Sequence, residues 1–94
     1  MNARMFTRNI VIGSRRTTVR LEAAIWEALD DMCVRERISR HELCTRVEAR
    51  RDKVNRAQAV RSVVMNYFRL SLKIGRPSGD MLDAALAYES DIVG

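Results

Sequence analysis

Three polar side chains alternate within GSRRTTVRLE, residues 13–22. Arg16, Thr18 and Arg20 are two residues apart, so in an extended strand they point to the same side. An arginine guanidinium is a planar fork of donors that matches two adjacent acceptors, such as O6 and N7 of guanine. The residues that point to the other side are Thr17, Val19 and Leu21. The pattern predicts a strand with a core face and a donor-rich outer face. The alternative is an outer face kept basic only to prevent aggregation at a strand edge.

A second group of polar residues lies in SRHE, residues 39–42. The spacing of Ser39 and Glu42 is that of a capping box, in which each side chain binds a backbone N–H at the start of a helix. The first turn of a helix points its backbone N–H groups outward, and these suit a phosphate. Arg40 and His41 oppose the helix dipole there unless an anion lies nearby. The pattern therefore favours an anion at this helix start.

The residues needed for catalysis or metal binding do not occur in a useful arrangement. His41 is the one histidine, and Cys44 falls on the apolar stripe of the same predicted helix. Cys33 and Cys44 have neither CxxC spacing nor a histidine-rich neighbourhood, so we expect buried thiols. No phosphate-binding loop is present in the sequence, because the four glycines are scattered. We expect no enzyme, no metal site and no cofactor.

The charge of the chain is uneven along its length. The 94 residues carry a net charge of +5, and residues 1–21 hold five arginines and no carboxylate. Residues 76–94 hold one arginine and four carboxylates, a balance of −3. A basic end favours a polyanion partner, and the alternative is a charge that serves only solubility. With no apolar run long enough for a membrane span or an export signal, we expect a cytoplasmic protein.

One domain is expected from this length, with helices positioning the strand. The predicted elements are a flexible basic arm (1–8), a short strand (9–12), a turn at Gly13 and Ser14, a strand (16–21), and helices over 23–35, from 39, over 55–73 and over 80–88. Trp26 is expected in the core, and Gly75 with Pro77 is expected to end the third helix. A two-stranded ribbon is marginal alone and leaves unpaired edges, so we expect a second copy of the chain to pair with it.

The segments RRTTVRLEAAIWEALDDM and ISRHEL resemble the ribbon-helix-helix DNA-binding proteins, the superfamily of the Arc and MetJ repressors. More narrowly, they resemble the proteobacterial ribbon-helix-helix domain proteins, over roughly residues 9–68. The resemblance implies a mainly α fold with a short N-terminal β-ribbon and an additional third helix. It also implies an intertwined homodimer in which each chain gives one strand of the ribbon. One departure is that the turn before Ser39 lacks the usual glycine, so Arg37 is expected to take the left-handed conformation.

The same resemblance implies roles for the polar residues. Arg16, Thr18 and Arg20 would read bases, while the start of the second helix, with Ser39, would hold the DNA backbone. The full set expected at the DNA backbone is Arg15, Ser39, Arg40 and His41.

These observations predict a homodimeric bacterial repressor that binds double-stranded DNA by sequence in the cytoplasm, at the nucleoid, with no membrane contact. The assembly on DNA is expected to be a dimer or of higher order. Residues 9–74 would form the DNA-binding domain and residues 75–94 an acidic tail. One alternative is an antitoxin whose residues 76–94 bind a toxin protein, through a stripe of Met81, Leu82 and Leu86. Another is a protein-interaction module whose basic face binds an acidic partner.

Overall fold

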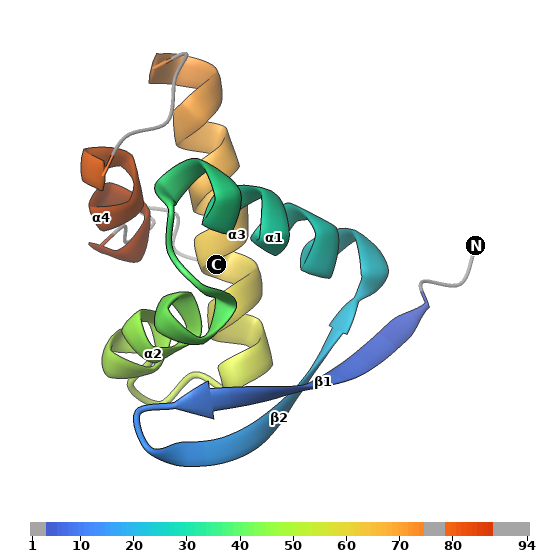
Figure 1. The fold of residues 1–94 in the computed structure, drawn as a ribbon. Helices are drawn as coiled ribbons and strands as arrows, with labels where there is room; N and C mark the ends of the chain where they lie inside the picture. Colours follow the sequence, from blue (N-terminus) through green and yellow to red (C-terminus); the bar gives the residue numbers. More distant parts are fainter. Residues whose placement is uncertain (1–3, 75–78, 88–94) are drawn as a thin grey trace.

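A hairpin of two strands lies across one end of the molecule, with the first three helices against it and the fourth farther away, beside the third (Figure 1). The computed structural model describes residues 4–74 and 79–87. Its elements are β1 (Met5–Ile12), β2 (Arg15–Glu22), α1 (Ala23–Glu36), α2 (Arg40–Arg50), α3 (Arg56–Ile74) and α4 (Gly79–Ala87). The mainly α fold with an N-terminal ribbon and a third helix is therefore confirmed. Among the described helices, none is long and apolar enough to cross a membrane.

The two strands form an antiparallel hairpin closed by a two-residue turn. Ile12 pairs with Arg15, and pairing continues to Met5 opposite Glu22. Gly13, the first turn residue, has a φ of +61°, which a glycine adopts without strain. A positive φ at the first turn position alone matches the type II′ turn, whose twist suits a hairpin.

The first strand is longer than the sequence analysis predicted. It begins at Met5, so residues 5–8 belong to the ribbon and not to a flexible arm. Residues 1–3 of the predicted arm lie outside the described residues. Residues 5–8 were missed because only Ile10 of the eight strand residues is fully buried, which leaves little apolar alternation to detect.

The two strands pair with each other within one chain. Every residue of β2 pairs with a residue of β1 in the same chain. The intertwined homodimer that the resemblance implies, in which a second chain supplies a strand, stays a prediction.

The helix boundaries follow local capping interactions. At the end of α1, Arg37 has φ 58° and ψ 42°, which confirms the predicted left-handed residue. At the start of α2, Ser39 Oγ accepts a 2.9 Å hydrogen bond from the Glu42 N–H, as expected of the cap. The Glu42 carboxylate pairs with Arg46 at 3.1 Å, and among the hydrogen bonds of the described residues none joins it to the Ser39 N–H as the capping box predicted. Asn55 caps α3 in the same way, accepting from the Gln58 N–H at 2.8 Å.

The core lies between the inner face of the hairpin and the helices. Trp26, the expected core residue of α1, is 2% exposed, and its Nε1–H donates to the Phe6 carbonyl at 2.9 Å. From α3, Tyr67 is fully buried, and its hydroxyl donates to Glu36 at 2.6 Å. Burial raises the pKa of the Tyr67 hydroxyl, and its bond to Glu36 raises that pKa further.

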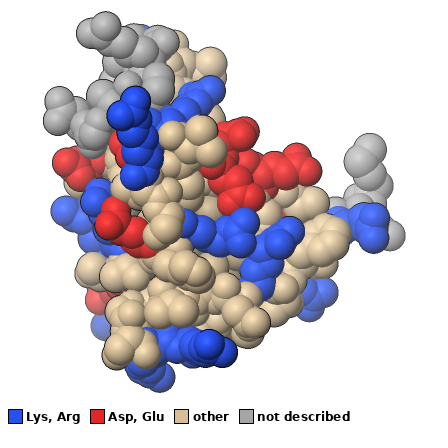
Figure 2. Space-filling model, viewed as in Figure 1, with Lys and Arg blue, Asp and Glu red and all other residues tan. Residues whose placement is uncertain are grey.

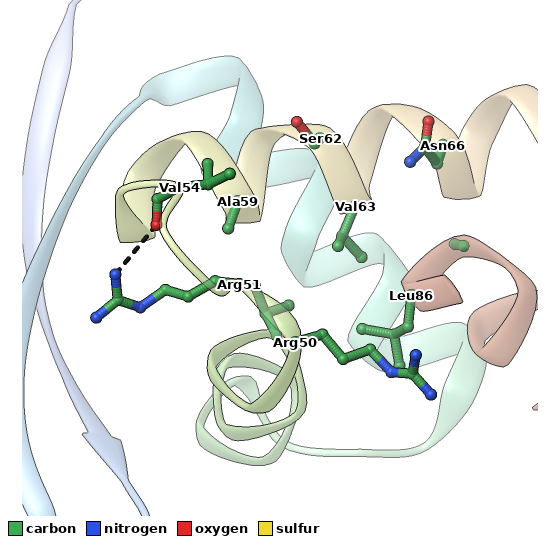
Figure 3. Close-up of a pocket in the computed structure, with 10 residues that line it drawn as sticks. Arg50, Arg51, Val54, Ala59, Ser62, Val63, Asn66 and Leu86 are labelled. Atoms are coloured by element: carbon green, nitrogen blue, oxygen red, sulfur yellow. Dashed lines mark hydrogen bonds between the residues drawn. The ribbon is translucent and has the colours of Figure 1, made fainter. Parts of the chain in front are cut away.

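The last described helix docks on its own chain. Met81, Leu82 and Ala85 of α4 are each 1% exposed and belong to the same core as α2 and α3. Beside them, a cavity of about 180 Å³ opens between α2, α3 and α4. Figure 3 shows Arg50 and Leu86 on one side of this cavity and Ser62, Val63 and Asn66 of α3 on the other. Gly75 and Pro77, which were expected to end α3, lie outside the described residues.

Candidate nucleic-acid interface

The outer face of β2 carries the three residues predicted to read bases. Arg16, Thr18 and Arg20 are all exposed, whereas Val19 is 3% exposed and Leu21 is fully buried. Alternation along the strand produces this separation, since successive side chains point to opposite faces. The structure therefore brings the three polar residues onto one surface, turned away from the helices.

Residues of β1 lie on the same outer surface, and the sequence analysis did not identify them. Thr7 is opposite Arg20, Asn9 is opposite Thr18, and Val11 is opposite Arg16. Thr7 and Asn9 are exposed. Paired residues of an antiparallel hairpin point to the same face. The polar surface thus has two rows of side chains instead of one.

The backbone of the ribbon has one free edge and one bound edge. The N–H of Val11 points away from β2 and donates to His41 Nδ1 at 3.0 Å. Val11 and Arg16 are therefore a non-hydrogen-bonded pair, and such pairs recur at every second position. The N–H of Gly13 donates to Thr45 Oγ1 at 3.2 Å. Side chains of α2 thus bind the outer edge of β1, while the other edge of β2 stays open.

The surface around the ribbon is strongly basic. Residues 4–22 hold five arginines and one carboxylate, Glu22. Arg61 Nε lies 2.8 Å from Glu22 Oε1, and this hydrogen bond lowers the pKa of Glu22. The one acid of the ribbon is thus already paired within the chain. Figure 2 shows basic side chains along the lowest margin, where the hairpin lies in Figure 1, and acidic side chains higher, near α1. The arginines of this segment are Arg4, Arg8, Arg15, Arg16 and Arg20.

The first turn of α2 lies beside the hairpin, but its side chains already have partners. Arg40 makes a two-pronged ion pair with Asp30 of α1, with Nη2 2.9 Å from Oδ1 and 3.0 Å from Oδ2. Its guanidinium also lies 5.3 Å from the centre of the Trp26 ring. His41 Nδ1 is occupied by Val11. The side chains of Arg40 and His41 therefore have partners within the chain, and their role at a DNA backbone stays a prediction.

Arg15 lies at a different place from the other predicted backbone-contact residues. It is exposed, it directly follows the turn, and it pairs with Ile12 of β1. Among the described residues no carboxylate pairs with it. Its guanidinium is thus available at the tip of the hairpin.

Two arginines of α3 join the hairpin to the helices. Arg56 pairs with Glu48 at 2.8 Å and donates to Thr17 Oγ1 at 3.0 Å, so α2, α3 and β2 meet at one side chain. The hydrogen bond from Arg56, helped by Arg51, lowers the pKa of Glu48 to about 2. Arg61 makes the second link, through Glu22. Both arginines therefore make ion pairs within the chain.

The thiols are placed as expected. Cys33 is 8% exposed and Cys44 is 2% exposed, and burial raises the pKa of each to about 11. A thiolate is the reactive form of cysteine, so both thiols are unreactive at neutral pH. His41 lies at the surface and binds Val11, whereas the Cys44 side chain is in the core. Across residues 4–74 and 79–87, no three metal-ligating side chains gather.

Comparison with known proteins agrees with this geometry. The family described as "Ribbon-helix-helix domain" matches residues 5–68. No curated protein matches the chain. Among solved structures, the fold is similar to that of an uncharacterized protein from Bordetella pertussis Tohama I, with a TM-score of 0.65 and 20% sequence identity. The match covers 98% of this chain and 88% of that one. The family match begins with β1 and ends within α3, so it includes the whole polar ribbon. The chain belongs to the ribbon-helix-helix domain family.

Proposed function

We propose that the protein is a sequence-specific regulator that binds double-stranded DNA with the outer face of its hairpin in the major groove. Proteins with a ribbon-helix-helix domain are in general DNA-binding regulators or antitoxins. The observation that carries the proposal is the exposed row of Arg16, Thr18 and Arg20 on a ribbon without an unpaired carboxylate. A major groove admits a two-stranded ribbon, and β-ribbon readers in this groove are a known docking mode.

Specificity and affinity would come from different residues. Arg16 and Arg20 present forked donors suited to guanine, and Thr18 presents a hydroxyl and a methyl group. Phosphate contacts hold a protein in register and supply most of the salt-dependent affinity. We assign these contacts to Arg15 and to the first turn of α2, at Ser39, Arg40 and His41. In that turn the backbone N–H groups would bind the phosphate, because the two basic side chains are held by Asp30 and Val11.

The proposed regulator acts as a homodimer and represses transcription at the nucleoid of a bacterial cell. Family membership supports pairing of two copies. A further support is the exposed apolar surface of α3, where Met65 is 58% exposed and Leu72 is 87% exposed. These two residues are seven positions apart and lie on one face of the helix. Two paired copies would occupy two half-sites, and occupation of a promoter would exclude other proteins from it.

The test is a titration of labelled duplexes with the protein across a range of salt concentrations. We expect tighter binding to a selected site than to random DNA, and an affinity for both that falls steeply with salt. Undetectable binding at low salt, or an affinity independent of salt, would overturn the proposal in favour of a protein-interaction module.

The antitoxin alternative loses support from the position of α4. Two residues of its proposed toxin-binding stripe, Met81 and Leu82, are buried in the core of their own chain. They would have to leave that core to contact a toxin. Residues 88–94 lie outside the described residues. We therefore prefer a DNA-binding regulator without a toxin partner to an antitoxin.

A further inference from the structure

The cavity between α2, α3 and α4 has no part in the proposed function. We propose that it binds a small carboxylic acid with a compact apolar body, and that the bound acid holds α4 against α2 and α3. The volume of the cavity is about 180 Å³. An apolar cavity of about 150 Å³ in another protein binds benzene, so this one is large enough for a molecule with a single ring. The proposal does not depend on DNA binding.

Small side chains leave this space where the three helices meet. Ala59 and Ser62 of α3 and Ala85 of α4 line it. The packing beside it is tight, because Met81, Leu82 and Ala85 are each 1% exposed. Protein interiors are close-packed and contain few voids larger than a water molecule. A cavity of this size next to a tightly packed core therefore favours a ligand over loose docking of α4.

Most of the wall is apolar and aliphatic. Val47 of α2, Val63 of α3 and Leu86 of α4 contribute to it, together with Val54 from the loop between α2 and α3. Figure 3 shows Ala59 and Val63 on the side of α3 that faces α2. Apolar surface buried against these side chains favours binding, and a fully hydrated ion such as phosphate has no such surface to bury. The wall therefore selects a ligand with an apolar body.

The rim of the cavity adds a positive charge. Arg50 is exposed, and no carboxylate among the described side chains pairs with it. Figure 3 shows the guanidinium of Arg50 beside Leu86 of α4, at the cavity that both residues line. A guanidinium binds a carboxylate through two parallel hydrogen bonds. Arg50 can therefore hold the charged end of the ligand while the apolar wall holds its body.

Glu48, two residues before Arg50, does not neutralise it, because two other arginines share this carboxylate. Arg56 approaches both of its oxygens, with Nε 2.8 Å from Oε1 and Nη2 3.1 Å from Oε2. Arg51 Nε also lies 2.8 Å from Oε1. None of the described residues that line the cavity carries a carboxylate. The local charge thus attracts an anion and repels a cation.

A molecule in this position would connect three helices. Its carboxylate would pair with Arg50 at the end of α2, and its body would pack on Val63 of α3 and Leu86 of α4. A ligand that binds only the folded arrangement stabilises that arrangement. We therefore expect binding to reduce local opening of α4, which is measured as slower hydrogen exchange of its amides.

The first test is a titration of the full chain with sodium benzoate, followed by thermal unfolding and by amide signals in nuclear magnetic resonance spectra. Benzamide has the same ring without the charge, and inorganic phosphate has charge without an apolar body. We expect benzoate to bind with a Kd on the order of 1 mM, to raise the Tm and to slow exchange in α4 but not in the hairpin. No binding of benzoate, or equal effects of benzamide or of phosphate, would overturn the proposal.

The second test compares variants of the cavity. Arg46→Gln is the matched control for Arg50→Gln, because Arg46 lies one turn earlier on α2 and outside the cavity. We expect Arg50→Gln to weaken benzoate binding about 5-fold and Arg46→Gln to leave it unchanged. Ala59→Leu should fill the cavity, keep the circular dichroism spectrum and abolish binding. Wild-type affinity for benzoate in Arg50→Gln or in a folded Ala59→Leu would overturn the proposal. Arg50 is exposed, so its variant tests the proposal even where Ala59→Leu does not fold.

Discussion

The backbone N–H of Val11 donates a 3.0 Å hydrogen bond to Nδ1 of His41, which joins the outer edge of β1 to the first turn of α2. This bond fixes the ring in the form that carries its proton on Nε2. It also places the start of α2 directly beside the hairpin. The same contact thus closes a strand edge and sets the distance between the two surfaces proposed to touch DNA.

Replacement of His41 should weaken the attachment of the β1 edge to α2. In His41→Ala the Val11 N–H loses its partner, so we expect the free energy of unfolding to fall by about 1 kcal/mol. We also expect faster hydrogen exchange at the Val11 amide. Thr45→Val is the matched control, since it should affect the Gly13 amide instead. Unchanged exchange at Val11 in His41→Ala would show that this bond does not hold the edge.

Loss of a base-reading arginine should change specificity. We expect Arg20→Ala to weaken binding to a selected site by about 1–3 kcal/mol and to relax one base position. Arg50→Ala removes the same charge from an exposed arginine at the end of α2 and controls for net charge. The measurement is competition between the selected site and its single-base variants. Equal losses on selected and random DNA for Arg20→Ala would remove it from the base-reading set.

Loss of a phosphate contact should weaken binding to all DNA sequences alike. We expect Arg15→Ala to lower affinity for selected and random DNA by the same factor, and to reduce the slope of log affinity against log salt by about 1. Arg40→Ala is a poorer probe than the sequence indicated, because it also breaks the ion pair with Asp30. An Arg15→Ala variant with altered base preference and an unchanged salt slope would contradict this assignment.

The ion pair of Glu48 and Arg56 should make stability depend on acid pH. The pKa of Glu48 is about 2 in the folded protein, below its ordinary value of 4.5. A lowered carboxylate pKa stabilises the fold fully above about pH 4.5, and this contribution is lost as the pH falls toward 2. We expect urea unfolding to show a smaller decline from pH 6 to pH 3 in Glu48→Gln than in the wild type. Glu27→Gln, at an exposed position on α1, should keep the wild-type decline, and identical declines in all three would contradict the prediction.

Local signals were sufficient to predict much of the fold. The alternation in β2, the cap at Ser39 and the left-handed Arg37 depend on neighbours in sequence, and the structure has all of them. The strand β1 was predicted only in part, because Arg8 occupies a core-face position and breaks the apolar alternation. Its guanidinium lies 5.5 Å from the centre of the Trp26 ring, a contact that the sequence does not reveal.

Contacts between distant residues account for what the sequence missed at the candidate site. Arg40 and His41 looked free at a helix start, but Asp30 and Val11, ten and thirty residues away, occupy them. Asn9 and Thr7 gave no signal of their own, because their place on the outer surface depends on which residues of β2 lie opposite. That register follows from the turn at Gly13 and from the full length of β1.

The central claim is that the outer face of the hairpin reads DNA sequence, and selection of bound duplexes from a random library tests it most directly. The wild-type protein should enrich a short motif with guanines, whereas a variant with alanine at Arg16, Thr18 and Arg20 should enrich none while keeping weak, salt-sensitive binding. Enrichment of the same motif by both proteins, or of no motif by the wild type, would contradict the claim.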